Sequence, residues 1–147
     1  MRINCMYPEG RLSEDDRRLF QRALKETLEI FNSGRSPLVL WCRLEADHLF
    51  RAREQSGLVS VSVILPDGTD ARTRTAVLQS VNNQWLALGH DDRDLMVAAL
   101  NQSMFATVQR QMLARLSTCA RIGFVLRTLV NLIRSRLSTG LAEYTLN

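Results

Sequence analysis

A short turn motif occurs twice in this chain and, with the segments around it, limits the folds that the chain can adopt. Pro8-Glu9-Gly10 and Pro66-Asp67-Gly68 are offset by 58 residues, and each follows a short apolar stretch. A proline, an acidic residue and a glycine in a row are typical of a tight turn. After each turn, apolar residues recur every three or four positions, which predicts an amphipathic helix. The first hundred residues therefore repeat one plan.

The two predicted helices have recognisable starts and ends. The first covers about residues 13–33, and Ser13 with the three acidic residues after it resembles a capping box. The second covers about residues 70–88 and is capped by Thr69 or Asp70. A glycine closes each helix. The apolar stripes are formed by Leu19, Phe20, Ala23, Leu24, Thr27, Leu28 and Phe31 in the first helix, and by Val77, Leu78, Val81, Trp85 and Leu88 in the second.

Four strands are predicted around these helices, at residues 2–7, 38–44, 58–65 and 94–100. A β-α-β crossover makes its two strands parallel and places the helix on one face of the sheet. We therefore predict an α/β fold in one domain, with duplicated β-α-β units forming a four-stranded sheet that has two helices on one face. The pseudo-repeats are residues 1–50 and 57–103. The opposite face needs another cover, which favours an oligomer or a cover built from residues 104–147.

Residues 104–137 contain no proline and one glycine, Gly123, which predicts a C-terminal helix or a bent pair of helices. Six arginines and no acidic residue occur between positions 95 and 142, but they scatter around the predicted helix. A nucleic-acid or membrane surface would need a concentrated basic face, so we expect neither partner. We interpret the segment as a packing helix whose apolar side chains are Phe105, Val108, Met112, Leu116, Cys119, Phe124, Leu126, Val130, Ile133 and Leu137.

Composition narrows the class of protein further. No apolar run reaches the roughly 18 residues that span a bilayer, and residues 1–5 do not resemble a signal peptide. The three cysteines are widely spaced, which indicates reduced thiols and a cytoplasmic protein. His48 and His90 lack metal-ligand spacing, and no phosphate-binding glycine loop is present. We therefore expect no metal and no cofactor.

In order and spacing, these features resemble the tautomerase superfamily, which includes 4-oxalocrotonate tautomerase, macrophage migration inhibitory factor, malonate semialdehyde decarboxylase and the chloroacrylic acid dehalogenases. The resemblance covers residues 1–103. Its most specific parts are Glu9-Gly10-Arg11 and the segment 61–89 followed by the strand 95–100. It implies a homotrimer and cofactor-free chemistry on small oxo-carboxylates, either keto–enol tautomerisation or decarboxylation.

The resemblance also implies a set of site residues. Members of the superfamily begin with a proline whose amine is the catalytic acid or base, and here Met1 stands in its place. The Met1 α-amine would then carry the proton, since a neutral amine can still act as a base. Arg11 would bind the substrate carboxylate through its planar guanidinium, unless it is a surface arginine beside the helix.

Further substrate-binding candidates follow the second and third strands. The decarboxylase branch has an arginine pair after its third strand, and the nearest arginines here are Arg72 and Arg74. They could replace that pair or be solvated residues of a first helical turn. His48 and Phe50 lie where the superfamily builds pocket walls.

Two classes of function remain open at this stage. One is an enzyme, similar to a tautomerase or decarboxylase, which uses the Met1 amine and Arg11. The other is a catalytically silent trimeric binding or interaction module on the same fold. The missing proline favours the module, and the presence of Arg11 favours the enzyme.

Overall fold

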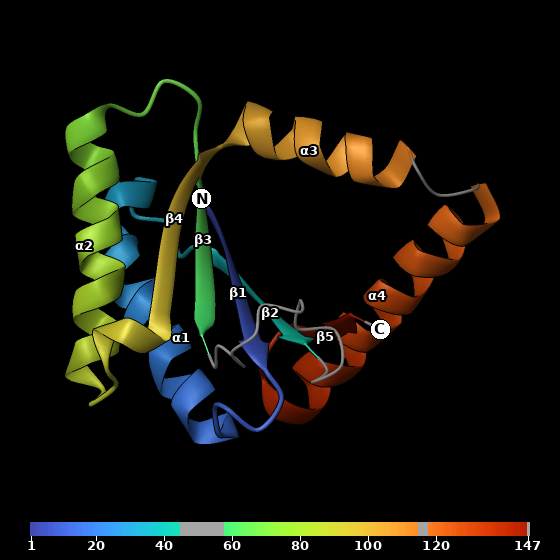
Figure 1. The fold of residues 1–147 in the computed structure, drawn as a ribbon, viewed down its shortest axis with the longest axis horizontal. Coiled ribbons are helices and arrows are strands. Elements are labelled where there is room, and N and C mark those ends of the chain that lie inside the picture. Colours follow the sequence, from blue (N-terminus) through green and yellow to red (C-terminus); the bar gives the residue numbers. More distant parts are fainter. Residues whose placement is uncertain (45–57, 115–117, 147) are drawn as a thin grey trace.

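The computed structural model describes residues 1–44, 58–114 and 118–146, except for the side chains of residues 112, 113, 118–121 and 146. The described strands form one sheet in the order β4-β3-β1-β2-β5 (Figure 1). The strands are β1 (Arg2–Pro8), β2 (Leu38–Leu44), β3 (Val59–Leu65), β4 (Leu95–Asn101) and β5 (Glu143–Leu146).

The two β-α-β units meet at the centre of this sheet. β1 is parallel to β2 and β3 is parallel to β4, whereas β1 and β3 are antiparallel. In the antiparallel pair, Arg2 lies opposite Ile64. The start of β1 is therefore beside the end of β3, and the segment after β3 lies close to Met1.

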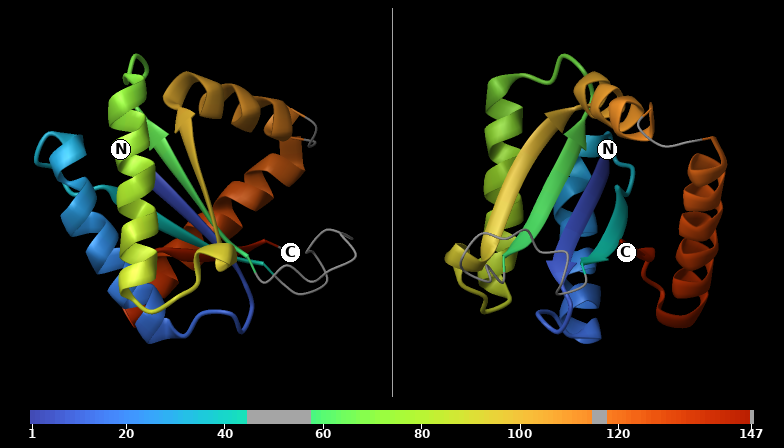
Figure 2. Two further views of the ribbon diagram at one scale, coloured as in Figure 1. Left: turned by 60° about the vertical axis from the view of Figure 1, so that its left-hand side comes forward. Right: turned by 45° about the vertical axis from the view of Figure 1, so that its right-hand side comes forward.

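Helices α1 (Glu14–Leu28) and α2 (Ala71–Ala87) lie side by side on one face of the sheet, as Figure 2 shows. Alternate residues of β1 and β3 point to this face because successive side chains of a strand point to opposite sides. The core between the layers consists mainly of Ile3, Cys5, Tyr7, Val59, Val61, Val63, Phe20, Leu24, Leu28, Val77, Val81 and Trp85. Leu19, which the predicted stripe included, is 48% exposed at its edge.

The predicted helix starts are confirmed in atomic detail. The Ser13 hydroxyl accepts a hydrogen bond from the Asp16 amide, and the Asp16 carboxylate accepts one from the Ser13 amide, which completes a capping box. Asp70 caps α2 by accepting a hydrogen bond from the Thr73 amide at 2.9 Å. Gly10 and Gly68, the last residues of the repeated turn, have φ angles of 79° and 84°, a left-handed conformation that favours glycine.

Both α1 and α2 end near a short 3-10 helix. α1 stops at Leu28, before the predicted residue 33, and η1 (Ile30–Asn32) continues the segment. η3 (Asp92–Asp94) lies between α2 and β4.

The fold class is as predicted, and the C-terminal segment adds to it. Helices α3 (Gln102–Ala114) and α4 (Thr118–Thr139) form the bent pair, and β5 extends the predicted four-stranded sheet by pairing parallel to β2.

The orientation of α4 differs from that of an ordinary packing helix. Apart from Leu132, its half-buried residues are polar (Thr128, Asn131, Ser135 and Thr139), and Ser135 donates a hydrogen bond to the Leu141 carbonyl at 3.0 Å. Its other large apolar residues with described side chains are 42% to 84% exposed and face away from the chain. The expectation that these apolar residues pack within the chain is therefore wrong for α4. No helix in the described part of the chain is long and apolar enough to span a membrane.

Candidate functional site

Met1 lies at the start of β1, where its side chain packs against the edge of the core. Its ammonium group donates a hydrogen bond to Asn32 Oδ1 at 2.8 Å. Asn32 Nδ2 in turn donates to the Arg35 carbonyl at 2.6 Å, which orients the amide so that its oxygen faces Met1. The turn after α1 therefore holds the α-amine in place at this end of the sheet.

Arg72 and Arg74 belong to the same end of the sheet as Met1, because α2 begins just after β3. Arg72 is exposed in the first turn of α2. Arg74 is half-buried, and its Nη2 donates a hydrogen bond to Asn101 Oδ1 at 2.6 Å. Arg74 thus ties α2 to the end of β4, which leaves Arg72 as the more available of the two guanidinium groups.

The beginning of α3 is anchored at this end too. The Asp67 carboxylate accepts hydrogen bonds from the Ser103 amide and hydroxyl at 3.0 and 2.8 Å, which lower the pKa of Asp67. The Arg2 guanidinium lies over the Phe105 ring, 5.1 Å from its centroid. The Met1 end of the sheet is therefore a junction of β1, β3, α2 and α3, visible at the top of Figure 1.

Arg11 lies at the opposite end of β1, in the turn before α1, where it forms an exposed ion pair with Asp94. A strand rises about 3.3 Å per residue, so the length of β1 separates Arg11 from Met1 by about 20 Å or more. Met1 and Arg11 are consequently not brought together within one chain. A site that contained both would need a second copy of the chain.

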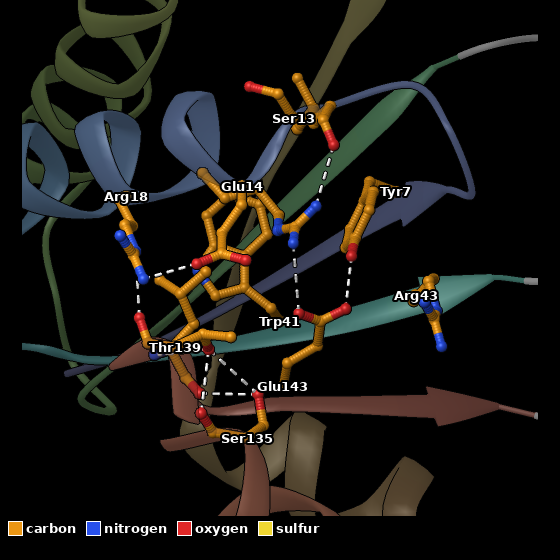
Figure 3. A network of polar contacts seen from close by, with 12 residues as sticks. Tyr7, Ser13, Glu14, Arg18, Trp41, Arg43, Ser135, Thr139 and Glu143 are labelled. Carbon is orange, nitrogen blue, oxygen red and sulfur yellow. Dashed lines mark hydrogen bonds and ion pairs between the residues drawn. The ribbon is translucent and has the colours of Figure 1, made fainter. Parts of the chain in front are cut away.

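A third group of polar residues joins the last strand to the first (Figure 3). The buried Tyr7 hydroxyl donates a hydrogen bond to the Glu143 carboxylate. Burial, followed by this hydrogen bond, raises the pKa of Tyr7 above its ordinary value. Arg17 reinforces the pair: its Nη2 lies 3.5 Å from the Glu143 carboxylate, and its guanidinium lies 4.8 Å from the Tyr7 ring centroid.

Neither a protein-family model nor a curated protein matches this chain, but solved structures do. N1, a member of the cis-3-chloroacrylic acid dehalogenase family, has a TM-score of 0.61 at 14% identity, covering 84% of this chain and 97% of N1. A fused 4-OT, solved as a symmetric trimer, has a TM-score of 0.57 at 18% identity, covering 69% of this chain and 85% of that one. FG41 malonate semialdehyde decarboxylase has a TM-score of 0.56 at 15% identity, covering 69% of this chain and 83% of that one.

This chain has the tautomerase-superfamily fold. At these sequence identities the likeness concerns the arrangement of the backbone. The role of each side chain in this tautomerase fold therefore follows from the contacts that it makes here. Two predicted site residues, His48 and Phe50, lie outside the described residues. In the part that the structure describes, no cluster of three or more His, Cys, Asp or Glu side chains could hold a metal ion.

Several residues that organise these sites in the tautomerase fold could not be predicted from sequence patterns. Asn32 and Asn101 look like ordinary polar residues at the ends of elements, and Tyr7 and Glu143 stand 136 positions apart. Only the strand order brings their partners into reach. The one available signal was that Glu143 ends the stretch of residues 95–142 that contains no acidic residue.

Proposed function

We propose that this protein works as a homotrimer of the tautomerase fold and serves as a binding or interaction module. The observation that carries the proposal is an apolar stripe on α4 that faces away from its own chain. The stripe residues are between 49% and 84% exposed: Ile122, Leu126, Leu129, Val130, Ile133 and Leu137. Their spacing of three and four places them on one side of the helix.

An exposed stripe of this kind calls for a partner. Covering these six side chains would contribute on the order of 5–10 kcal/mol, which can offset much of the entropic cost of association. Met96 on β4 and Met104 and Val108 on α3 are also about half exposed, so the same chain offers further apolar surface. Large contiguous apolar patches on soluble proteins usually mark an interface.

Charge favours the main body of a second copy as the surface that covers the stripe. Residues 95–142 contain six arginines and no acidic residue, so two α4 helices side by side would repel each other. Residues 1–94 are close to neutral, with 14 acidic and 13 basic residues, and the acidic ones include Glu14, Asp15 and Asp16 together at the start of α1. The trimeric arrangement of fused 4-OT proteins supports an assembly of three copies.

Size exclusion coupled to light scattering tests the assembly. We expect the native chain to elute at about three times 16.7 kDa, and the double substitution Leu126→Glu, Ile133→Glu to yield a monomer. Ser138→Glu is the matched control, since it adds a negative charge on the polar side of the same helix. A monomeric native chain, or a double variant that stays trimeric, would contradict the proposal.

A second candidate function, proton transfer on small oxo-carboxylates, is favoured by the contact between Met1 and Asn32. An α-amine held at 2.8 Å from a fixed carbonyl oxygen is positioned for chemistry. In its neutral form it would accept a proton from the carbon beside the substrate's keto group, and the resulting ammonium would deliver a proton to the keto oxygen, which yields the enol. Arg72, exposed at the same end, would bind the carboxylate.

The only lysine, Lys25, makes this second candidate testable. In the Lys25→Arg variant, the α-amine is the sole primary amine of the chain, so acetylation would block it selectively. Mass spectrometry would verify that the amine belongs to Met1. We expect acetylation to abolish the keto–enol turnover of phenylpyruvate that the unmodified variant retains.

A variant that starts with Met-Pro in place of Met1-Arg2 gives the complementary result. Removal of the initiator would leave a proline amine at the start of β1, and turnover should rise. If neither the native chain nor this variant exceeds catalysis by the buffer, proton transfer is not the function and the module remains.

A further inference from the structure

A cavity of about 280 Å³ is lined by residues of β2, α4 and β5, and Met1 is not among them. It opens to solvent, and two arginines line it, Arg43 from β2 and Arg134 from α4. Ser138, Tyr144 and Thr145 also line it. The cavity is formed within one chain, so it depends on neither of the functions proposed above.

Arg43 has hydrogen-bonding capacity to spare. Its Nη1 lies 3.5 Å from the Glu9 carboxylate, and its Nη2 donates to Thr145 Oγ1 at 3.3 Å, both at the long end for such contacts. Its buried Nε has no hydrogen-bond partner. Figure 3 shows the Arg43 guanidinium apart from the Tyr7–Glu143 pair. The charge of Arg43 is therefore only weakly compensated by the protein.

Arg134 is less compensated still. It is exposed on α4, inside the stretch of residues 95–142 that contains no acidic residue. It takes part in no ion pair within the described part of the chain. Two guanidinium groups with free donors consequently line one small cavity.

The one acidic residue in the lining, Glu143, is already occupied. One of its carboxylate oxygens accepts the Tyr7 hydrogen bond, and the other lies 3.5 Å from Arg17 Nη2. Tyr7 and Arg17 thus compensate the charge of Glu143, so Glu143 does not neutralise the two arginines of the cavity. What remains for a ligand is a lining of hydrogen-bond donors with excess positive charge.

We infer that this cavity binds a small oxyanion, a carboxylate or phosphate group held between Arg43 and Arg134. A planar guanidinium donates two parallel hydrogen bonds to either group, and the Thr145 hydroxyl, which accepts from Arg43, keeps its own hydrogen to donate. The volume lies at the lower limit of small-molecule sites, so the ligand is no larger than a small metabolite.

Calorimetric titration of the full chain with malonate, inorganic phosphate and the neutral malonamide tests the inference. We expect saturable binding of malonate, phosphate or both, with one site per chain, and no binding of malonamide. The stronger of the two oxyanions identifies the natural group as a carboxylate or a phosphate.

Matched arginine variants locate the site. Arg134 is exposed, so Arg134→Gln should leave the fold intact and weaken binding about tenfold, a loss typical of a charge-assisted hydrogen bond. Arg136→Gln, on the same helix but outside the lining, should change the affinity less than about twofold. Absence of saturable binding, equal binding of malonamide, or equal losses in the two variants would overturn the inference.

Discussion

Tyr7 and Glu143 are hydrogen-bonded to each other, although 136 residues separate them in the chain. Tyr7 belongs to the central strand β1, and Glu143 begins the edge strand β5 on the far side of β2. Arg17 of α1 approaches the same carboxylate. This contact therefore holds the last strand, and α4 before it, to the core.

Substitution of Tyr7 by phenylalanine should measure the strength of this link. The variant removes the donor to a carboxylate that is only 14% exposed, so we expect the free energy of unfolding to fall by about 1.5–3 kcal/mol. Chemical denaturation at a fixed protein concentration gives the value.

The control for Tyr7→Phe is Glu14→Gln, which breaks an exposed ion pair with Arg18 at 2.5 Å. It should cost less than about 1 kcal/mol, because exposed pairs contribute little. Equal stability of Tyr7→Phe and the native protein would show that β5 is held by its backbone pairing alone.

The chain contains two tyrosines, and their ionisation should make its stability depend on pH in the alkaline range. Burial raises the pKa of Tyr144 to about 12, and burial and the Glu143 hydrogen bond raise the pKa of Tyr7. Between pH 10 and the pKa values of the tyrosines in the folded protein, the unfolded chain has lost these protons and the folded chain retains them. The folded state is therefore stabilised fully below about pH 10 and loses stability as the pH rises above it.

Absorbance of tyrosinate during a pH titration checks this prediction. The native protein should show no ionised tyrosine at pH 10.5, whereas the chain unfolded in urea should titrate at about 10. A native tyrosine that ionises at pH 10 would contradict the buried positions of these side chains.

Two leucines of α1 provide a matched test of the core. Leu24 is fully buried and Leu19 is 48% exposed. Leu24→Ala should lower the free energy of unfolding by about 2–5 kcal/mol because it leaves a cavity, and Leu19→Ala should cost less than about 1 kcal/mol. Similar losses in the two variants would mean that α1 is rotated relative to the sheet.

The capping box at α1 predicts a linked change in stability and ionisation. Ser13→Ala removes the side-chain hydrogen bonds at the helix start and should cost about 1 kcal/mol, whereas Ser36→Ala, at an exposed loop position, should be neutral. The Ser13 hydroxyl also lowers the pKa of Asp16. In Ser13→Ala, a carboxyl titration by NMR should show the Asp16 pKa moving up toward its ordinary value.

Local patterns in the sequence determined the elements of the first hundred residues. The capping box at Ser13, the cap at Asp70 and the paired turns at Gly10 and Gly68 involve residues only a few positions apart. Interactions over such short spans are the same in every fold that contains the helix or turn. Helix starts, strands and their β-α-β order could therefore be predicted, and with them the α/β class.

The tertiary structure alone decided which strands, helices and side chains are neighbours. β5 spans four residues and is a strand only because the edge of β2 is there to pair with it. The side of α4 that faces the chain is set by contacts such as the hydrogen bond from Ser135 to the Leu141 carbonyl just before β5, and no periodicity indicates that the apolar side faces out. Strand order likewise places Met1 and Arg11 at opposite ends of β1. These outcomes depend on contacts between residues that are distant in the sequence, and a one-dimensional pattern does not encode such distances.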